Sequence, residues 1–161
     1  MTIVDPCGTE TNVRQATLAD LLDVTVLENR CFPYPWPYTA FERHLDAPAF
    51  LVAIHDEQLV GHVVGDVRDD FLGQLGHIKD LAVDPSMRRR GIGRQLLAAA
   101  LRVLARTNVD RTMLEVRESN DPAIELYRSF GFEHQRVHPG YYEDGEDAIV
   151  MLRDARKIGR R

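Results

Sequence analysis

The spacing of hydrophobic residues along the chain predicts four helices. Apolar residues at intervals of three and four predict one helix from about residue 18 to 30 and another over residues 91–105. A short helix is expected over residues 39–45. The dipeptide Asp121-Pro122 predicts the start of a fourth helix, with Asp as its N-cap and Pro in its first turn, and Gly131 predicts its end.

Apolar stretches bounded by turn residues predict strands. Residues 50–54 and 59–67 are expected to form a hairpin around the turn Asp56-Glu57-Gln58. Further strands are predicted over residues 12–15, 77–83, 111–117, 133–138 and 147–152. The order β-α-α-β-β-β-α-β-α-β-β predicts an α/β fold built around one mixed sheet.

Composition narrows the class of protein. The 161 residues suit one well-packed domain, and no repeat or linker divides them, so we expect a single domain over residues 1–161. The basic end, residues 153–161, is expected to be a flexible, solvated tail, the alternative being a contact with ribosomal RNA. The net charge of −5 argues against electrostatic binding to nucleic acid or to an anionic membrane.

No stretch approaches the roughly 18 consecutive apolar residues of a membrane span, and the N-terminus lacks the pattern of a signal peptide. A cytoplasmic location is therefore expected. Cys7 and Cys31 suggest neither a disulfide framework nor a metal site. The six histidines, among them His62 and His77, form no ligand pattern, so structural roles and no bound metal are expected.

The stretch "MRRRGIGRQLL", residues 87–97, combines dense positive charge with backbone freedom. The start of a helix presents free N–H groups and partial positive charge, glycine lets an anion approach, and arginine adds charge. The spacing fits neither the Walker loop nor the dinucleotide fingerprint. The stretch therefore predicts a phosphate-binding turn, the alternative being a solvated run of arginines before an ordinary helix.

The stretch of residues 87–97, together with the "LAVDP" that precedes it, resembles the acetyl-CoA pyrophosphate motif of the GNAT acetyltransferase superfamily. The resemblance implies a GNAT fold, in which a mixed, mostly antiparallel central sheet has helices on both faces. It also implies that acetyl-CoA is the acetyl donor. The cofactor-binding residues that it implies are Leu81, Ala82 and Val83 beside the pantetheine arm, Arg88, Arg89, Arg90, Gly91, Ile92, Gly93 and Arg94 around the phosphates, and Asn120 at a pantetheine carbonyl.

The stretches "LEVRESNDPAIELYRSFGFE" and "YYEDGEDAIVML" narrow the resemblance to RimI-type ribosomal-protein-alanine acetyltransferases and their archaeal relatives. These enzymes acetylate protein N-termini. The resemblance implies that Tyr34, Trp36, Tyr141 and Tyr142 line the entrance for the peptide, whereas exposed tyrosines without a function are the alternative. Eukaryotic relatives carry a glutamate in the loop that follows the first helix. The corresponding loop here, "CFPYPWPY", has no carboxylate, and the one nearest to it in the sequence is that of Glu28.

Acetyl transfer to an amine requires a proton acceptor for the amine and a proton donor for the departing thiolate. An N-terminal amine, with a reference pKa of about 7.7–8.0, needs a weaker base than a lysine at about 10.4. The resemblance assigns Glu115 as the acceptor and Tyr127 as the donor. A glutamate paired with an arginine, and a tyrosine packed in the core, are the structural alternatives.

The sequence thus predicts an N-α-acetyltransferase that transfers acetyl from acetyl-CoA to a protein N-terminus directly, in a ternary complex, with a ribosomal protein as one candidate partner. The alternatives are a GNAT enzyme that acetylates a small amine or a lysine, and a non-catalytic module that binds CoA.

Overall fold

A computed structural model describes residues 2–4 and 10–158 of the chain. Its strands form one eight-stranded sheet in the order β1-β2-β3-β4-β5-β6-β8-β7, in which β5 and β6 are parallel and the other neighbours are antiparallel. The strands are β1 (Thr2–Val4), β2 (Glu10–Gln15), β3 (Ala49–His55), β4 (Gln58–Asp70), β5 (Gly73–Val83), β6 (Arg111–Arg117), β7 (Glu133–His138) and β8 (Ala148–Asp154).

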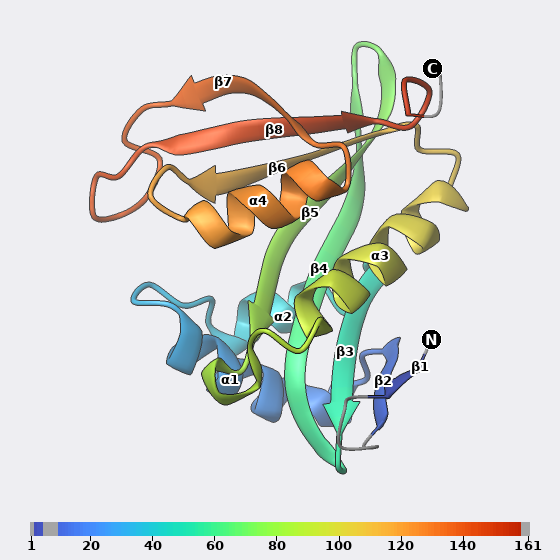
Figure 1. Ribbon diagram of the computed structural model, residues 1–161, viewed down its shortest axis with the longest axis vertical. Helices are drawn as coiled ribbons and strands as arrows, with labels where there is room; N and C mark the ends of the chain where they lie inside the picture. Colours follow the sequence, from blue (N-terminus) through green and yellow to red (C-terminus); the bar gives the residue numbers. More distant parts are fainter. Residues whose placement is uncertain (1, 5–9, 159–161) are drawn as a thin grey trace.

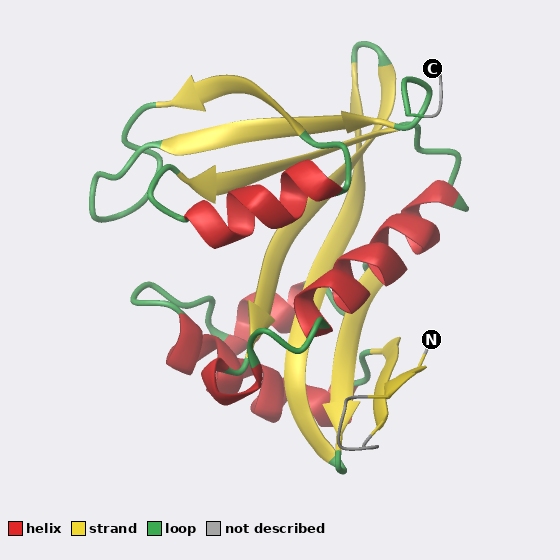
Figure 2. Ribbon diagram, viewed as in Figure 1, coloured by secondary structure: helices red, strands yellow, loops and turns green. Residues whose placement is uncertain are grey.

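The helices cover both faces of the sheet, as predicted (Figures 1 and 2). They are the α-helices α1 (Leu21–Cys31), α2 (Tyr38–Arg43), α3 (Ile92–Ala105) and α4 (Asp121–Ser129), with the short 3-10 helices η1 (Leu18–Asp20) and η2 (Pro85–Met87). Helices α3 and α4 pack on one face over the larger hydrophobic core, and α1 and α2 pack on the other over a second core.

The apolar side of helix α3 packs against the sheet. Leu96, Leu97 and Leu104 lie on the side of the helix that faces the sheet, and all three are almost fully buried. Burial of such a side chain contributes about 1.5–3 kcal/mol, so this one stripe fixes the helix against the sheet. Because α3 is held in this way, the turn that precedes it has a fixed position relative to β5.

The sheet opens between β5 and β6. These strands pair only where residues 75–78 meet residues 111–114. Beyond Ile78, β5 stays paired with β4, whereas β6 stays paired with β8. The two strands therefore diverge toward their C-terminal ends, as Figure 1 shows, and the residues that follow Ile78 lie along an open edge.

A β-bulge lies next to this opening. Val64 pairs with Asp80, but Gly65 pairs with Ile78, so Lys79 is an extra residue on β5. Residues directly opposite each other in antiparallel strands point to the same face, and a bulge changes which residues share that face. His77 and Asp80 therefore point to the same side of the sheet, although they are three residues apart.

Several boundaries differ from the sequence-based expectations. Strand β1 was not predicted, and the hairpin of β4 and β5 extends to Asp70 and Gly73, well beyond the predicted ends. The N-cap of α4 is Asn120, whose side-chain oxygen accepts a hydrogen bond from Ala123 N, so assigning the cap to Asp121 was wrong. Asp121 is instead the first residue of the helix.

The predicted tail begins later than residue 153. Arg153 and Asp154 belong to β8, because the pairing of β8 with β6 continues to the first residue of β6. The Arg153 side chain also donates a hydrogen bond to Phe130 O at 2.9 Å. The last three residues of the predicted tail and Cys7 lie outside the described residues.

No helix within the described part of the chain is long and apolar enough to cross a membrane.

Candidate active site

The predicted phosphate-binding turn connects β5 to α3. Gly91 is the N-cap of α3 and has a left-handed φ of 81°, and Arg89 has a φ of 65°. Left-handed residues of this kind curve the chain so that successive N–H groups face one concave surface, a geometry that binds anions. No acidic residue lies in the first turn of α3, and a Cβ atom on Gly91 would have no neighbour within 4 Å. These features are the ones expected of a pyrophosphate-binding turn, a role that stays a prediction for this segment.

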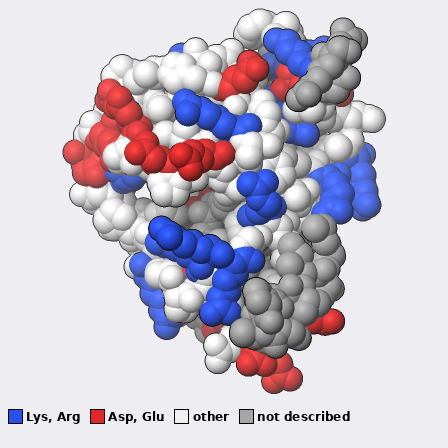
Figure 3. Space-filling view, viewed as in Figure 1, with Lys and Arg blue, Asp and Glu red and all other residues white. Residues whose placement is uncertain are grey.

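The side chains of Arg88, Arg89, Arg90 and Arg94 are exposed around this turn. Figure 3 shows basic side chains gathered near the start of α3, and acidic side chains gathered over the other half of the same face. Some of these arginines are partly engaged by protein groups. Arg88 Nε donates to Val83 O at 3.4 Å, and Arg94 donates to Ser129 Oγ at 3.0 Å. Their predicted contacts with phosphate stay predictions.

Leu81, Ala82 and Val83 lie on the open edge of β5, directly before the phosphate-binding turn. Their backbone groups on the β6 side have no strand partner, because pairing with β6 ends at Ile78. This edge is suited to hydrogen bonding with an extended chain such as a pantetheine arm. The side chain of Asn120, across the opening, caps α4 with its oxygen, which leaves its NH₂ group able to donate.

Glu115 and His77 form a close pair at the point where β5 and β6 separate. His77 Nε2 donates to Glu115 Oε2 at 2.7 Å, and both side chains are largely buried. Burial alone would raise the pKa of Glu115, but the hydrogen bond from His77, together with the charges of His77 and Arg68, lowers it below its ordinary value. Glu115 therefore stays ionised in this pair. An arginine partner was the structural alternative for Glu115, but the partner that the structure shows is a histidine, which no feature of the sequence singled out.

Tyr127 reaches the opening from α4. Its ring lies in the larger core and packs edge-on against Phe132, with the ring centres 6.0 Å apart. Burial, with a contribution from the negative charge of Asp80, raises the pKa of Tyr127 above its usual value. Its hydroxyl makes no hydrogen bond with any residue that the structure describes. The ring thus has the packing role of a core residue, while the hydroxyl keeps its proton and remains able to donate it.

The four predicted entrance residues fall into two groups on opposite sides of the opening. Trp36 packs against Phe41 beneath its loop, whereas Tyr34 is exposed. Tyr141 and Tyr142 lie in the loop between β7 and β8.

The side chain of Arg117 contacts several residues of the loop between β7 and β8. The guanidinium of Arg117 lies 4.1 Å from the centre of the Tyr142 ring and forms ion pairs with Asp144 and Glu146 at 2.9 and 3.0 Å. Burial, reinforced by Tyr141, raises the pKa of Tyr142 to about 12, so its hydroxyl stays protonated. This arrangement presents two neutral aromatic side chains to the entrance.

A second group of titratable side chains, which the sequence did not reveal, lies beneath the other side of the entrance. His62 Nε2 contacts Glu28 Oε2 at 3.1 Å and Asp80 Oδ2 at 2.9 Å. We call these three residues the buried triad. They come from α1, β4 and β5, so only the tertiary structure brings them together.

The buried triad contains the ligand types of a metal site, and its nitrogen and oxygen atoms all lie within 4.8 Å of one another. Tetrahedral coordination at about 2.0–2.1 Å separates neighbouring ligand atoms by about 3.3 Å. The shorter contacts of 2.9 and 3.1 Å instead have the length of direct hydrogen bonds from the imidazole. The three side chains of the triad are therefore joined by hydrogen bonds.

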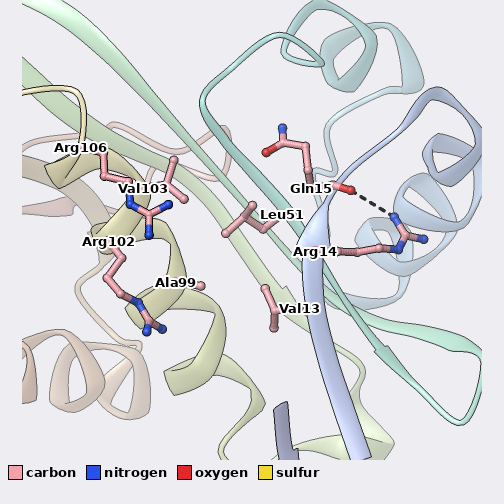
Figure 4. Close-up of a pocket in the computed structure, with 8 residues that line it drawn as sticks. All are labelled: Val13, Arg14, Gln15, Leu51, Ala99, Arg102, Val103 and Arg106. Carbon is pink, nitrogen blue, oxygen red and sulfur yellow. Dashed lines mark hydrogen bonds between the residues drawn. The ribbon is translucent and has the colours of Figure 1, made fainter. Parts of the chain in front are cut away.

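A hollow of about 380 Å³ lies between α3 and the strands β2 and β3 (Figure 4). Its lining includes Val13, Leu51, Arg102 and Arg106, and the backbone oxygen of Gln15 there accepts a hydrogen bond from Arg14 at 3.1 Å. None of the predicted site residues lines this hollow. It is therefore separate from the candidate active site.

Comparison with known proteins gives consistent matches. The acetyltransferase (GNAT) family matches residues 21–132, which is more than half of the chain. An N-alpha-acetyltransferase of Sulfurisphaera tokodaii is 37% identical, across 89% of this chain and 93% of the relative. A putative ribosomal protein bS18-alanine N-acetyltransferase of Bacillus subtilis is 33% identical, across 89% of this chain and 95% of the relative.

A solved structure agrees with these sequence matches. The ribosomal-protein-S18-alanine N-acetyltransferase from Escherichia coli superimposes with a TM-score of 0.79 and 29% identity, across 90% of this chain and 94% of that one. The predicted GNAT fold is confirmed by this match and by the arrangement of the sheet and helices. The chain belongs to the acetyltransferase (GNAT) family.

Proposed function

We propose that this protein is an N-α-acetyltransferase, which transfers the acetyl group of acetyl-CoA to the α-amine of a protein N-terminus. The observation that carries the proposal is the opening between β5 and β6: the Glu115–His77 pair lies where the two strands separate, and β5 leads on from there to the predicted phosphate-binding turn. The names of the archaeal and bacterial relatives support the same activity. Because two of these names specify a ribosomal protein, we include the N-termini of ribosomal proteins in the substrate class.

The residues have complementary roles in this reaction. The amine attacks the thioester carbonyl, and as the new C–N bond forms, the nitrogen becomes strongly acidic. Glu115 accepts a proton from it at that stage, and His77 keeps the carboxylate oriented. Tyr127 donates its proton to the sulfur of the departing CoA. The raised pKa of Tyr127 keeps its hydroxyl protonated until the thiolate departs, so the proton is present when the sulfur needs it.

A competition assay with two peptides tests the function. One peptide has a free α-amine, and the other has the same sequence with a blocked N-terminus and one internal lysine. We expect acetylation of the α-amine only, located by mass spectrometry, because at pH 7 roughly a tenth of α-amines but well under a thousandth of lysines are neutral. Acetylation of the lysine peptide alone, or no acetylation in the presence of bound acetyl-CoA, would contradict the proposal.

Replacement of Tyr127 by phenylalanine separates chemistry from packing. We expect kcat to fall about 10-fold, because the thiolate loses its proton donor, while the KM for acetyl-CoA changes little. The melting temperature should stay nearly unchanged, since the hydroxyl has no hydrogen-bond partner among the described residues. Steady-state kinetics and calorimetry measure both, with Tyr38→Phe on α2 as the matched control. A large loss of stability with normal kcat would make Tyr127 purely a core residue.

A further inference from the structure

The buried triad forms a continuous path from the entrance loop to the opening in the sheet. Trp36 N donates to Glu28 Oε1 at 3.3 Å, and Glu28 Oε2 is joined through His62 to Asp80. The side chains of Glu28 and His62 are 2% and 0% exposed, whereas that of Asp80 keeps 9%. Of the three, Asp80 is therefore the member with access to the opening.

Asp80 also lies beside the catalytic pair. It is the second residue of β5 after pairing with β6 ends, and the bulge at Lys79 turns it to the same face of the sheet as His77. The negative charge of Asp80 contributes to the raised pKa of Tyr127 on α4. Oδ2 of Asp80 is held by His62, and no donor among the described residues contacts Oδ1.

The proposed reaction needs a second proton acceptor. A peptide N-terminus arrives mostly as –NH₃⁺ at pH 7, and the product amide retains one hydrogen on nitrogen, so two protons must leave. Glu115, with its lowered pKa, is a weak base toward an ammonium group, and it suits the later, more acidic nitrogen. The first proton has to go elsewhere.

We propose that Asp80 accepts this first proton from the α-ammonium group of the peptide, and that the Glu28–His62–Asp80 triad stores it. The inference rests on the proposed function and adds a catalytic residue, Asp80, and two residues that act through it. With the imidazole protonated, the triad has a net charge of −1, and one further proton makes it neutral.

An N–H bond of the ammonium group breaks, its electron pair stays on nitrogen for the attack, and an O–H bond forms on Asp80. His62 Nε2 then gives its proton to Glu28 Oε2 and takes the one from Asp80. After the product leaves, the proton on Glu115 restores the Tyr127 hydroxyl by way of solvent, and the stored proton returns through Asp80 to solvent, so the overall reaction releases one proton.

The electrostatics of the triad favour this storage. Burial and the neighbouring Asp80 carboxyl raise the pKa of Glu28 and the hydrogen bond from His62 lowers it, and together these effects bring the pKa to about 7. Burial would lower the pKa of His62, but its hydrogen bonds to both carboxylates bring the value to about 9. A proton acceptor with a pKa near 7 is well matched to an amine with a pKa of about 7.7–8.0.

Other titratable groups surround the triad. Cys31 on α1 is half-buried and interacts with Glu28, and Tyr127 faces Asp80 from α4. Lys79, next to Asp80, contacts His44 at the end of α2 at 3.2 Å and Asp66 on β4 at 3.8 Å. The Lys79 ammonium is thus already paired. The net charge of the triad is therefore set by its own three side chains.

The test is the dependence of kcat/KM on pH for Asp80→Asn, measured with the peptide and acetyl-CoA. Without the acceptor only the neutral amine reacts, so we expect kcat/KM to be about 5- to 10-fold below that of the unmodified enzyme at pH 7 and less than 2-fold below it at pH 9. A peptide that carries an aminooxy group in place of its α-amine is neutral at pH 7. With this peptide the deficit at pH 7 should disappear, which a structural defect would not produce.

Asp66→Asn is the matched control, because Asp66 is an aspartate on the same face of the sheet that lies outside the triad. It should keep the pH profile of the unmodified enzyme. Glu28→Gln provides a second variant in case Asp80→Asn fails to fold, since its amide oxygen can still accept from Trp36 N. It should show the same deficit at pH 7 and the same rescue by the aminooxy peptide.

A uniform loss at every pH, or no rescue by the aminooxy peptide, would overturn the proton-storage role while leaving the proposed function intact. A stoichiometric metal ion that is lost in Glu28→Gln would also overturn it. If the unmodified enzyme acetylates no α-amine, the proposed function itself fails.

Discussion

Gly91→Val is expected to weaken the binding of acetyl-CoA by about 100-fold or more. Gly91 has a φ of 81°, in a region where a β-branched residue is strained by about 1–3 kcal/mol. The turn will relax to another conformation, and the N–H groups at the start of α3 will no longer converge. Hydrogen bonds to a charged group contribute about 1.5–3 kcal/mol each, so the loss of two gives the expected effect. Isothermal titration calorimetry with acetyl-CoA measures it.

Gly73→Val is the control for backbone strain. Gly73 also has a positive φ, of 117°, and a Cβ there would have no neighbour within 4 Å. It lies at the far end of the hairpin of β4 and β5, away from the phosphate-binding turn (Figure 1). We expect this variant to lose stability but to bind acetyl-CoA with an unchanged Kd. Normal affinity in Gly91→Val would show that the turn does not hold the phosphates.

Glu115→Gln is expected to lower kcat by about 100-fold, which is typical for the loss of a general base. Glutamine keeps the shape of the side chain and can still accept the hydrogen bond from His77, but it has almost no proton affinity. Because the lowered pKa keeps Glu115 ionised throughout the working range, the factor should be similar from pH 6.5 to pH 9. Initial rates at saturating substrate measure it, with exposed Glu118→Gln as the control.

A deficit in Glu115→Gln that vanishes at high pH would contradict this role. In that case Glu115 itself would take the first proton from the ammonium group, as the wholly neutral amine would no longer need it. The two carboxylates are thus distinguished by their pH profiles. Loss of Asp80 should matter only at lower pH, whereas loss of Glu115 should matter at every pH.

The sequence by itself determined the features that depend on local chemistry. Strands β6 and β7 have the predicted bounds, and α3 begins one residue after the predicted start and ends at the predicted residue. Asp121-Pro122 placed the start of α4 to within one residue, because proline fixes φ in a first helical turn without losing a hydrogen bond. The phosphate-binding role of the turn before α3 stays a prediction, and it was made from equally local features. Arginine, glycine and the start of a helix act together within a few residues of one another.

The tertiary structure alone decided which side chains meet. His77 and Glu115 are 38 residues apart in the sequence, and His62 is 34 residues from Glu28 and 18 from Asp80. No local pattern marks such a pair, so histidines that the sequence suggested were merely structural proved to contact carboxylates beside the opening. The bulge at Lys79 was equally hidden, because it depends on the register between β4 and β5 rather than on either strand alone. That one extra residue places Asp80 on the same face as His77.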